Sequence, residues 1–255
     1  MRQSYSMISV LAVLVTTDEL VTAVPTSLQI RGETTKAPLI SSKGIKPEDV
    51  DHGSWDSSWF NSVAVAIGHA RPNDLEQCWS GSSTDEITEA DFNLYDKQGE
   101  KKTLKVKLKD VMDKNEADSH SVKQGWKLIE GKLASSPYRL DTDHFTTGQP
   151  TDAFKMLANK DAEVYDFAKE QNKDDLWTLF TWAAHTPIVF SSIATDGTEV
   201  WFAVLSAKSG DLEDGEKPWE KGEVKYYAAN RHAIDTLNLA KEGDQIAHAV
   251  HWKFD

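Results

Sequence analysis

The sequence predicts an α+β fold in which a helical half precedes an antiparallel sheet half. Apolar residues recur with helical spacing up to about residue 185, and from about residue 186 they alternate with polar residues. Turn-forming segments with Gly and Asp-Gly separate the later runs, as in strands that fold back on one another. Helices first and strands later are typical of α+β domains. The 255 residues, 39% of them hydrophobic, suffice for a substantial core.

The helical half is expected over residues 51–185. Its first helix is predicted over residues 57–69, where apolar side chains fall at i, i+3, i+4 and i+7 and so share one buried face. These side chains are Phe60, Val63, Ala64 and Ile67. Further helices are expected over residues 121–134, 149–158 and 174–185, and a β-hairpin over residues 90–113.

The sheet half is expected over residues 186–255, and its five predicted strands cover residues 186–194, 199–207, 221–229, 233–240 and 246–254. His248 and His251 share the last strand, and their odd separation places them on opposite faces, which argues against a shared metal site. The sequence has no HExxH motif, no EF-hand pattern and no Gly-rich phosphate loop. Acidic loops such as residues 211–216 are interpreted as solvated. We therefore expect no metal, calcium included, and no cofactor.

The amino terminus is typical of a secretory signal. Arg2 is followed by a short apolar run at residues 7–15 and by small residues suited to cleavage after Ala23. Nine apolar residues are too few to cross a bilayer, and a buried first strand is the alternative interpretation. We expect a signal peptide over residues 1–23, an extended arm over residues 24–50 and a folded domain over residues 51–255, which would make the mature protein secreted, extracellular and free of the membrane.

Charge and cysteine content narrow the classes of partner. The formal net charge of −13 argues against nucleic acid as a partner, because phosphate neutralisation needs a basic surface. The Lys-rich stretch over residues 97–110 is interpreted as a strand with one solvated face. Cys78 is the only cysteine, so an internal disulfide is excluded, and a small buried hydrophobic role is expected for it. We therefore expect an acidic monomer that prefers a basic or neutral protein or peptide as its partner.

The helix start in GSWDSSWFNSVAVAIGHA (residues 53–70) is the strongest candidate for a functional site. Ser57 and Ser58 stand where a helix-capping residue belongs, and Asp56 could also cap the helix. A nucleophile also suits this place, because a helix N-terminus favours an anion. His232 opens a predicted strand in the sheet half, from which its imidazole could accept the nucleophile's proton.

Several segments resemble the calpain family of cysteine proteases. SWDSSWFNSVAVAI is similar to the calpain active-site helix, whose pattern is Gly-Asp-Cys-Trp-Phe followed by small apolar residues. Four further segments resemble calpain segments: residues 90–112, 125–140, 152–167 and 231–239. The resemblance implies a papain-like fold, with a degenerate calpain-like domain that covers about residues 50–255.

The resemblance also implies roles for individual residues. Ser58 stands at the nucleophilic Cys, and His232 matches the catalytic His. His52 falls where the family has its oxyanion-hole Gln. The Asn-Pro-Trp motif that orients the His has no clean counterpart beyond Trp252, and Asp235, three residues after His232, is the candidate orienter.

These departures weaken the implied catalysis. A helix dipole and an imidazolium bring a Cys thiol to ionisation near neutral pH, whereas a Ser hydroxyl gains almost no anion from them. The sequence therefore predicts a secreted calpain-like pseudoprotease that acts by binding, with an effector or virulence role as one form of that binding. Two alternatives stay open: an active hydrolase that uses a Ser58–His232 dyad, and a cysteine protease whose nucleophile was replaced by Ser58.

Overall fold

The computed structural model describes residues 46–47, 58–80, 87–107, 148–167, 172–228, 231 and 233–253. The chain divides into two compact units, residues 1–33 and residues 34–255, and every described residue belongs to the second unit. The predicted signal peptide and the predicted helix over residues 121–134 lie outside the described residues. Within the described ranges, no helix combines the length and the apolar character that a membrane span needs.

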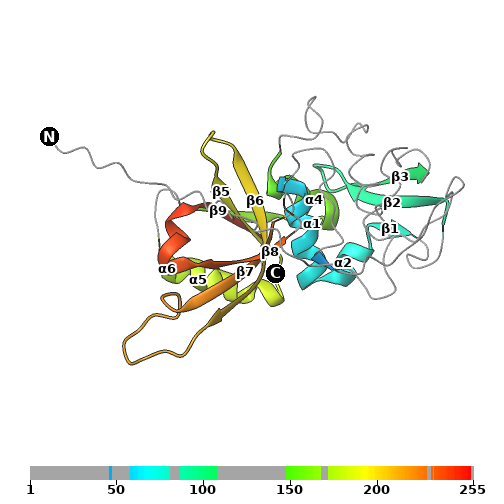
Figure 1. The fold of residues 1–255 in the computed structure, drawn as a ribbon. Helices are drawn as coiled ribbons and strands as arrows, with labels where there is room; N and C mark the ends of the chain where they lie inside the picture. The colour runs from blue at the N-terminus through cyan, green and yellow to red at the C-terminus, as the bar shows by residue number, and fades with distance from the viewer. Residues whose placement is uncertain are drawn as a thin grey trace, which may run out of the picture. The chain divides into compact units, whose positions relative to one another are not determined.

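Three predicted helices are confirmed, with small changes at their ends (Figure 1). Helix α1 covers Ser58–Ala70, α4 covers Pro150–Ala158, and α5 covers Lys173–Thr181. The last turn of the predicted helix over residues 174–185 is instead the 3-10 helix η3, Trp182–Ala184. Within the described ranges, short helical segments that the sequence did not predict are α2 (Pro72–Glu76), α6 (Leu239–Glu242) and the 3-10 helix η5 (Gly243–Gln245).

A small antiparallel sheet has the strand order β1-β2-β3. Its strands are β1 (Trp79–Ser80), β2 (Glu89–Tyr95) and β3 (Lys101–Lys107). Strands β2 and β3 pair in register with Phe92 opposite Leu104, which confirms the predicted hairpin. Lys101 and Lys105 are exposed on β3, in keeping with the predicted solvated face.

A larger antiparallel sheet has the order β4-β9-β5-β6-β7-β8. The five predicted strands are confirmed as β5 (Ile188–Ile193), β6 (Glu199–Ser209), β7 (Gly222–Ala228), β8 (Ala233–Asn238) and β9 (Ile246–Trp252). Strand β8 ends two residues early because the Asn238 side chain caps α6, accepting a hydrogen bond from the Lys241 N–H at 3.3 Å.

One strand corrects the predicted division into a helical and a sheet half. Strand β4 (Ala162–Asp166) comes from the segment expected to belong to the helical half, but it pairs along β9 at the edge of the larger sheet. It has only five residues, and its partner lies more than 80 residues further along the chain. A strand that owes its place to such distant pairing leaves little local signal in the sequence.

The two faces of the larger sheet bury separate hydrophobic clusters. Trp201, Ala203 and Leu205 of β6 belong to the cluster that includes α1 and α4, and we call this side the α1 face. Val204 belongs to the cluster that includes α5, and we call that side the α5 face. Helix α1 contacts β6, β5, α2 and α4, and eleven of its thirteen residues are buried. A helix buried on all sides needs the nearly continuous apolar sequence that follows Ser58.

Cys78 lies in the core on the α1 face, as expected of a structural cysteine. Its side chain is buried, and its Sγ donates a weak hydrogen bond to the Leu157 carbonyl at 3.1 Å. Burial raises the pKa of this thiol from 9.0 to about 12. Because the unfolded thiol ionises near 9.0 and the folded thiol near 12, the folded state loses stability as pH rises between these values.

We therefore expect Cys78 to be unreactive in the native protein. An aromatic disulfide reagent at mildly alkaline pH should release no thiolate chromophore from the folded chain, because thiolate is the reacting species and the sulfur is covered. Addition of concentrated guanidinium should release one equivalent. Stoichiometric reaction of the native protein would contradict this placement of Cys78.

Candidate functional site

Ser58 begins α1, and its hydroxyl ties the helix start to the larger sheet. The residue is 3% exposed, and its Oγ accepts a hydrogen bond from the backbone N–H of Trp201 on β6 at 3.3 Å. The two residues are 143 positions apart in the sequence. The hydroxyl therefore satisfies a backbone donor at the junction of helix and sheet, where an unpaired N–H would be costly.

Of the other predicted site residues, Asp235 and Trp252 belong to the described part of the chain. His232, His52 and Ser57 lie outside the described residues. Asp235 is described, on β8, and its carboxylate forms an ion pair with Arg231 at 2.5 Å. Asp235, the residue predicted to orient His232, is thus paired with the Arg231 guanidinium.

Trp252, the remnant of the family's Asn-Pro-Trp motif, lies near the end of β9 in the core on the α1 face, 6% exposed. The Arg71 guanidinium lies 5.5 Å from the centre of its ring and the Lys160 ammonium 5.7 Å. Trp252 therefore has a clear packing role.

A polar cluster that the sequence did not predict lies on the α1 face. It consists of one residue from each of four strands: Asp166 (β4), Ser191 (β5), Glu199 (β6) and His248 (β9). We call it the Glu199 cluster. The Ser191 hydroxyl and the His248 Nδ1 both donate to Glu199 Oε1 at 2.6 Å. The His248 backbone N–H donates to Ser191 Oγ at 3.1 Å, and Asp166 lies 4.0 Å from His248 Nε2.

Trp201 connects the Glu199 cluster to Ser58, but the hydrogen bonds of the cluster are not those of a nucleophilic triad. Trp201, whose N–H binds Ser58, is opposite Ser191 in the strand register, and its ring stacks on His248 with centroids 6.3 Å apart. In a triad the carboxylate, the imidazole and the hydroxyl are linked in series. Here the hydroxyl and the imidazole both donate to one carboxylate oxygen, and Ser191 is fully buried. This arrangement fixes four strands together.

The two histidines of β9 lie on opposite faces, as predicted. His248 contacts the Glu199 cluster on the α1 face, whereas the His251 ring stacks on Tyr165 of the α5 face with centroids 5.5 Å apart. Burial lowers the pKa of His251, so its neutral form is favoured. Within the described ranges, no group of three His, Cys, Asp or Glu side chains is arranged to hold a metal ion.

Loss of the central carboxylate should destabilise the fold. Glu199→Ala leaves Ser191 and His248 without their shared acceptor, and we expect the free energy of unfolding to fall by about 2 kcal/mol. The matched control is Glu223→Ala on β7, which removes the same charge from an exposed position and should change stability by less than about 0.5 kcal/mol. Urea denaturation followed by circular dichroism measures both. Equal effects would contradict the structural role of the cluster.

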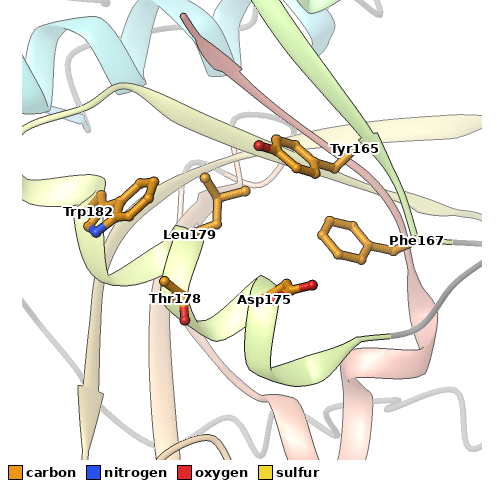
Figure 2. Close-up of a pocket in the computed structure, with 6 residues that line it drawn as sticks. All are labelled: Tyr165, Phe167, Asp175, Thr178, Leu179 and Trp182. Carbon is orange, nitrogen blue, oxygen red and sulfur yellow. The ribbon is translucent and has the colours of Figure 1, made fainter. Parts of the chain in front are cut away.

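A hollow opens between β4 and the α5–η3 segment (Figure 2). We call it the Trp182 hollow; its volume is about 190 Å³, and it is lined by Tyr165, Phe167, Asp175, Thr178, Leu179 and Trp182. A second hollow of about 410 Å³ shares Trp182 and reaches His185. Tyr165 and Phe167 lie on the α5 face, so the Trp182 hollow and Ser58 belong to opposite faces of the sheet.

Comparisons with known proteins give a weak likeness to a protease. No protein-family model matches the chain, and no curated protein matches it. Among solved structures, the chain is similar to the active wild-type interpain A cysteine protease of Prevotella intermedia, with a TM-score of 0.34 and 9% identity. The match covers 85% of this chain and 94% of that one. A TM-score this low supports no statement about the family or the activity of this chain.

Proposed function

We propose that this chain is a secreted, catalytically inactive protein of the calpain and papain type that acts by binding another protein or a peptide. The observation that carries the proposal is the state of Ser58. Its hydroxyl is buried at the junction of α1 and β6 and accepts a hydrogen bond from the Trp201 N–H. Secretion is proposed from the sequence of residues 1–23, and the family from the segments that resemble calpains.

The surroundings of Ser58 favour a structural role over an attacking one. A nucleophile must meet its substrate, and Ser58 is 3% exposed. It also needs a base to take its proton, whereas the hydrogen bond at Ser58 Oγ comes from the Trp201 backbone N–H, which is a donor and not a base. In addition, His52 stands where the family has its oxyanion donor, and loss of one such donor typically lowers the rate about 10²–10³-fold.

Exposed hydrophobic side chains support a binding role. Several large apolar residues are between 42% and 55% exposed: Val164, Tyr165, Trp182, Ile193, Leu212 and Ile234. Three of these, Val164, Tyr165 and Trp182, lie at or near the β4 edge of the sheet. Large aromatic side chains at a surface are the usual anchors of protein interfaces.

Turnover assays with Ser58 variants test this proposal. We expect the purified protein to cleave neither casein nor fluorogenic peptides, with or without calcium. Ser58→Ala should show the same absence of activity and, because the Trp201 N–H loses its acceptor, a free energy of unfolding lower by about 1 kcal/mol. Robust cleavage by the native chain that Ser58→Ala abolishes would overturn the proposal. Thiol-dependent cleavage by Ser58→Cys would show that the nucleophile alone had been lost.

A further inference from the structure

Three aromatic side chains and one leucine line the Trp182 hollow, together with Asp175 and Thr178. Tyr165 and Trp182 are 42% and 43% exposed, and the Tyr165 ring also stacks on Phe167 and on His251, with centroids 6.1 Å and 5.5 Å apart. Leu179 and Phe167 are each 5% exposed and form the buried part of its lining. Figure 2 shows the Tyr165 and Phe167 rings on the β4 side of the space and Trp182 on the η3 side. The exposed Trp182 ring at this edge suits a flat group that can stack on an aromatic side chain.

A carboxylate held in place borders the same hollow. Asp175 lies in the first turn of α5, where the cap residue Asn172 donates from its amide to Asp175 Oδ2 at 2.6 Å and accepts from the Asp175 N–H at 3.4 Å. These contacts hold the carboxylate at the hollow. Its one partner side chain here is a neutral amide, and among the residues that the structure describes no Lys or Arg forms an ion pair with Asp175.

The phenol of Tyr165 lies near two carboxylates. Its pKa is raised, first by burial and then by the negative charges of Glu163 and Asp175. Glu163 is on the same face of β4 as Tyr165, with 44% of its side chain exposed. Both charges that act on this phenol are carboxylates, and one of them, Asp175, lines the hollow.

We propose that the Trp182 hollow binds the guanidinium of an arginine side chain on a partner protein. The planar guanidinium stacks on aromatic faces, donates to carboxylates and is more weakly hydrated than an ammonium, which favours arginine over lysine here. The net charge of −13 also attracts a basic partner. This inference rests on the proposed binding role and names the chemistry of its partner.

Titration with a minimal probe tests the proposal. Nα-acetyl-arginine amide is added to the full chain, and the Trp182 indole N–H signal, assigned with Trp182→Phe, is followed by NMR. We expect saturable shifts, and binding roughly fivefold to thirtyfold weaker for the isosteric but neutral citrulline amide. Asp175→Asn should weaken arginine binding by a similar factor, whereas Asp214→Asn, the same charge change in an exposed turn, should leave it unchanged.

Three results would overturn the proposal: no saturable shift of the indole signal, equal binding of the citrulline probe, or equal losses in Asp175→Asn and Asp214→Asn. Nα-acetyl-lysine amide binding as tightly as the arginine probe would overturn the choice of guanidinium. Trp182→Ala removes an exposed ring and should abolish the shifts of the remaining hollow residues, with folding checked by circular dichroism. Ser58 is on the opposite face of the sheet from the Trp182 hollow. The turnover assays with Ser58 variants therefore do not decide the arginine titration, and the titration does not decide the turnover assays.

Discussion

Phe60→Ala is expected to lower the free energy of unfolding by about 3–5 kcal/mol. Phe60 lies in the first turn of α1, is 1% exposed, and packs edge-on against Trp59 with ring centroids 5.7 Å apart. Its truncation loses the transfer of a large aromatic side chain and leaves a cavity where helix and sheet meet, which the surrounding core can only partly fill. Urea denaturation followed by circular dichroism measures the change as a shift of the midpoint.

The control for this prediction is an apolar side chain that the fold leaves in solvent. Leu212 is 44% exposed, and Leu212→Ala should change the free energy of unfolding by no more than about 0.5 kcal/mol. A loss below about 1 kcal/mol for Phe60→Ala would mean that the start of α1 is not buried as described. In that case Ser58 would not be enclosed either.

Gly222→Ala is expected to cost about 3 kcal/mol, at the upper end of the range for overpacking. Gly222 begins β7, and the Trp177 ring of α5 rests directly on its backbone. A Cβ at this position would lie 2.2 Å from a Trp177 ring carbon and 2.7 Å from the Pro218 carbonyl oxygen. Because one of these neighbours is backbone, rotation of a side chain cannot relieve both clashes. Thermal unfolding of the variant measures the loss as a lower Tm.

A second glycine provides the matched control. In Gly243→Ala the new Cβ would meet only the end of the flexible Lys173 side chain at 3.3 Å and a Leu239 methyl at 3.7 Å. We expect a change within about 1 kcal/mol, of either sign. A small effect of Gly222→Ala, comparable with that of Gly243→Ala, would contradict the close approach of α5 to β7.

Local periodicity in the sequence predicted the elements that carry their own signal. The apolar stripe after Ser58 located α1 to within a residue, and the alternation after residue 186 located β5 to β9. The Lys-rich run predicted β3 because its exposed face alternates with apolar positions. In each case the side chains of one segment determine which face it buries.

Features that depend on distant partners could not be predicted in this way. Strand β4 owes its place to β9, and the hydroxyl of Ser58 to a backbone N–H on β6. The Glu199 cluster joins four strands whose order in the sheet differs from their order in the sequence. Polar residues such as Ser191 at inward positions of apolar strands were its only sequence signal.

The candidate site was predicted in part. Sequence reasoning placed Ser58 at a helix start, and the structure places it at the first residue of α1, against the sheet. The partner that it proposed, His232, lies outside the described residues, so the dyad stays a prediction. His248 is linked to the Ser58 region through Trp201, and spacing along the chain could not have identified it, because the link runs through strand pairing.

Labelling with a fluorophosphonate probe tests most directly whether Ser58 has lost its chemistry. Activated serine hydroxyls form a stable adduct with such a probe, whereas a hydroxyl that is buried and bound to a backbone N–H does not. The native chain is treated with the probe and digested, and the peptide that contains Ser58 is examined by mass spectrometry, with a known serine hydrolase as the positive control. We predict an unmodified Ser58 peptide at probe concentrations that label the control completely. An adduct on Ser58 that is lost when the chain is denatured before treatment would contradict this account.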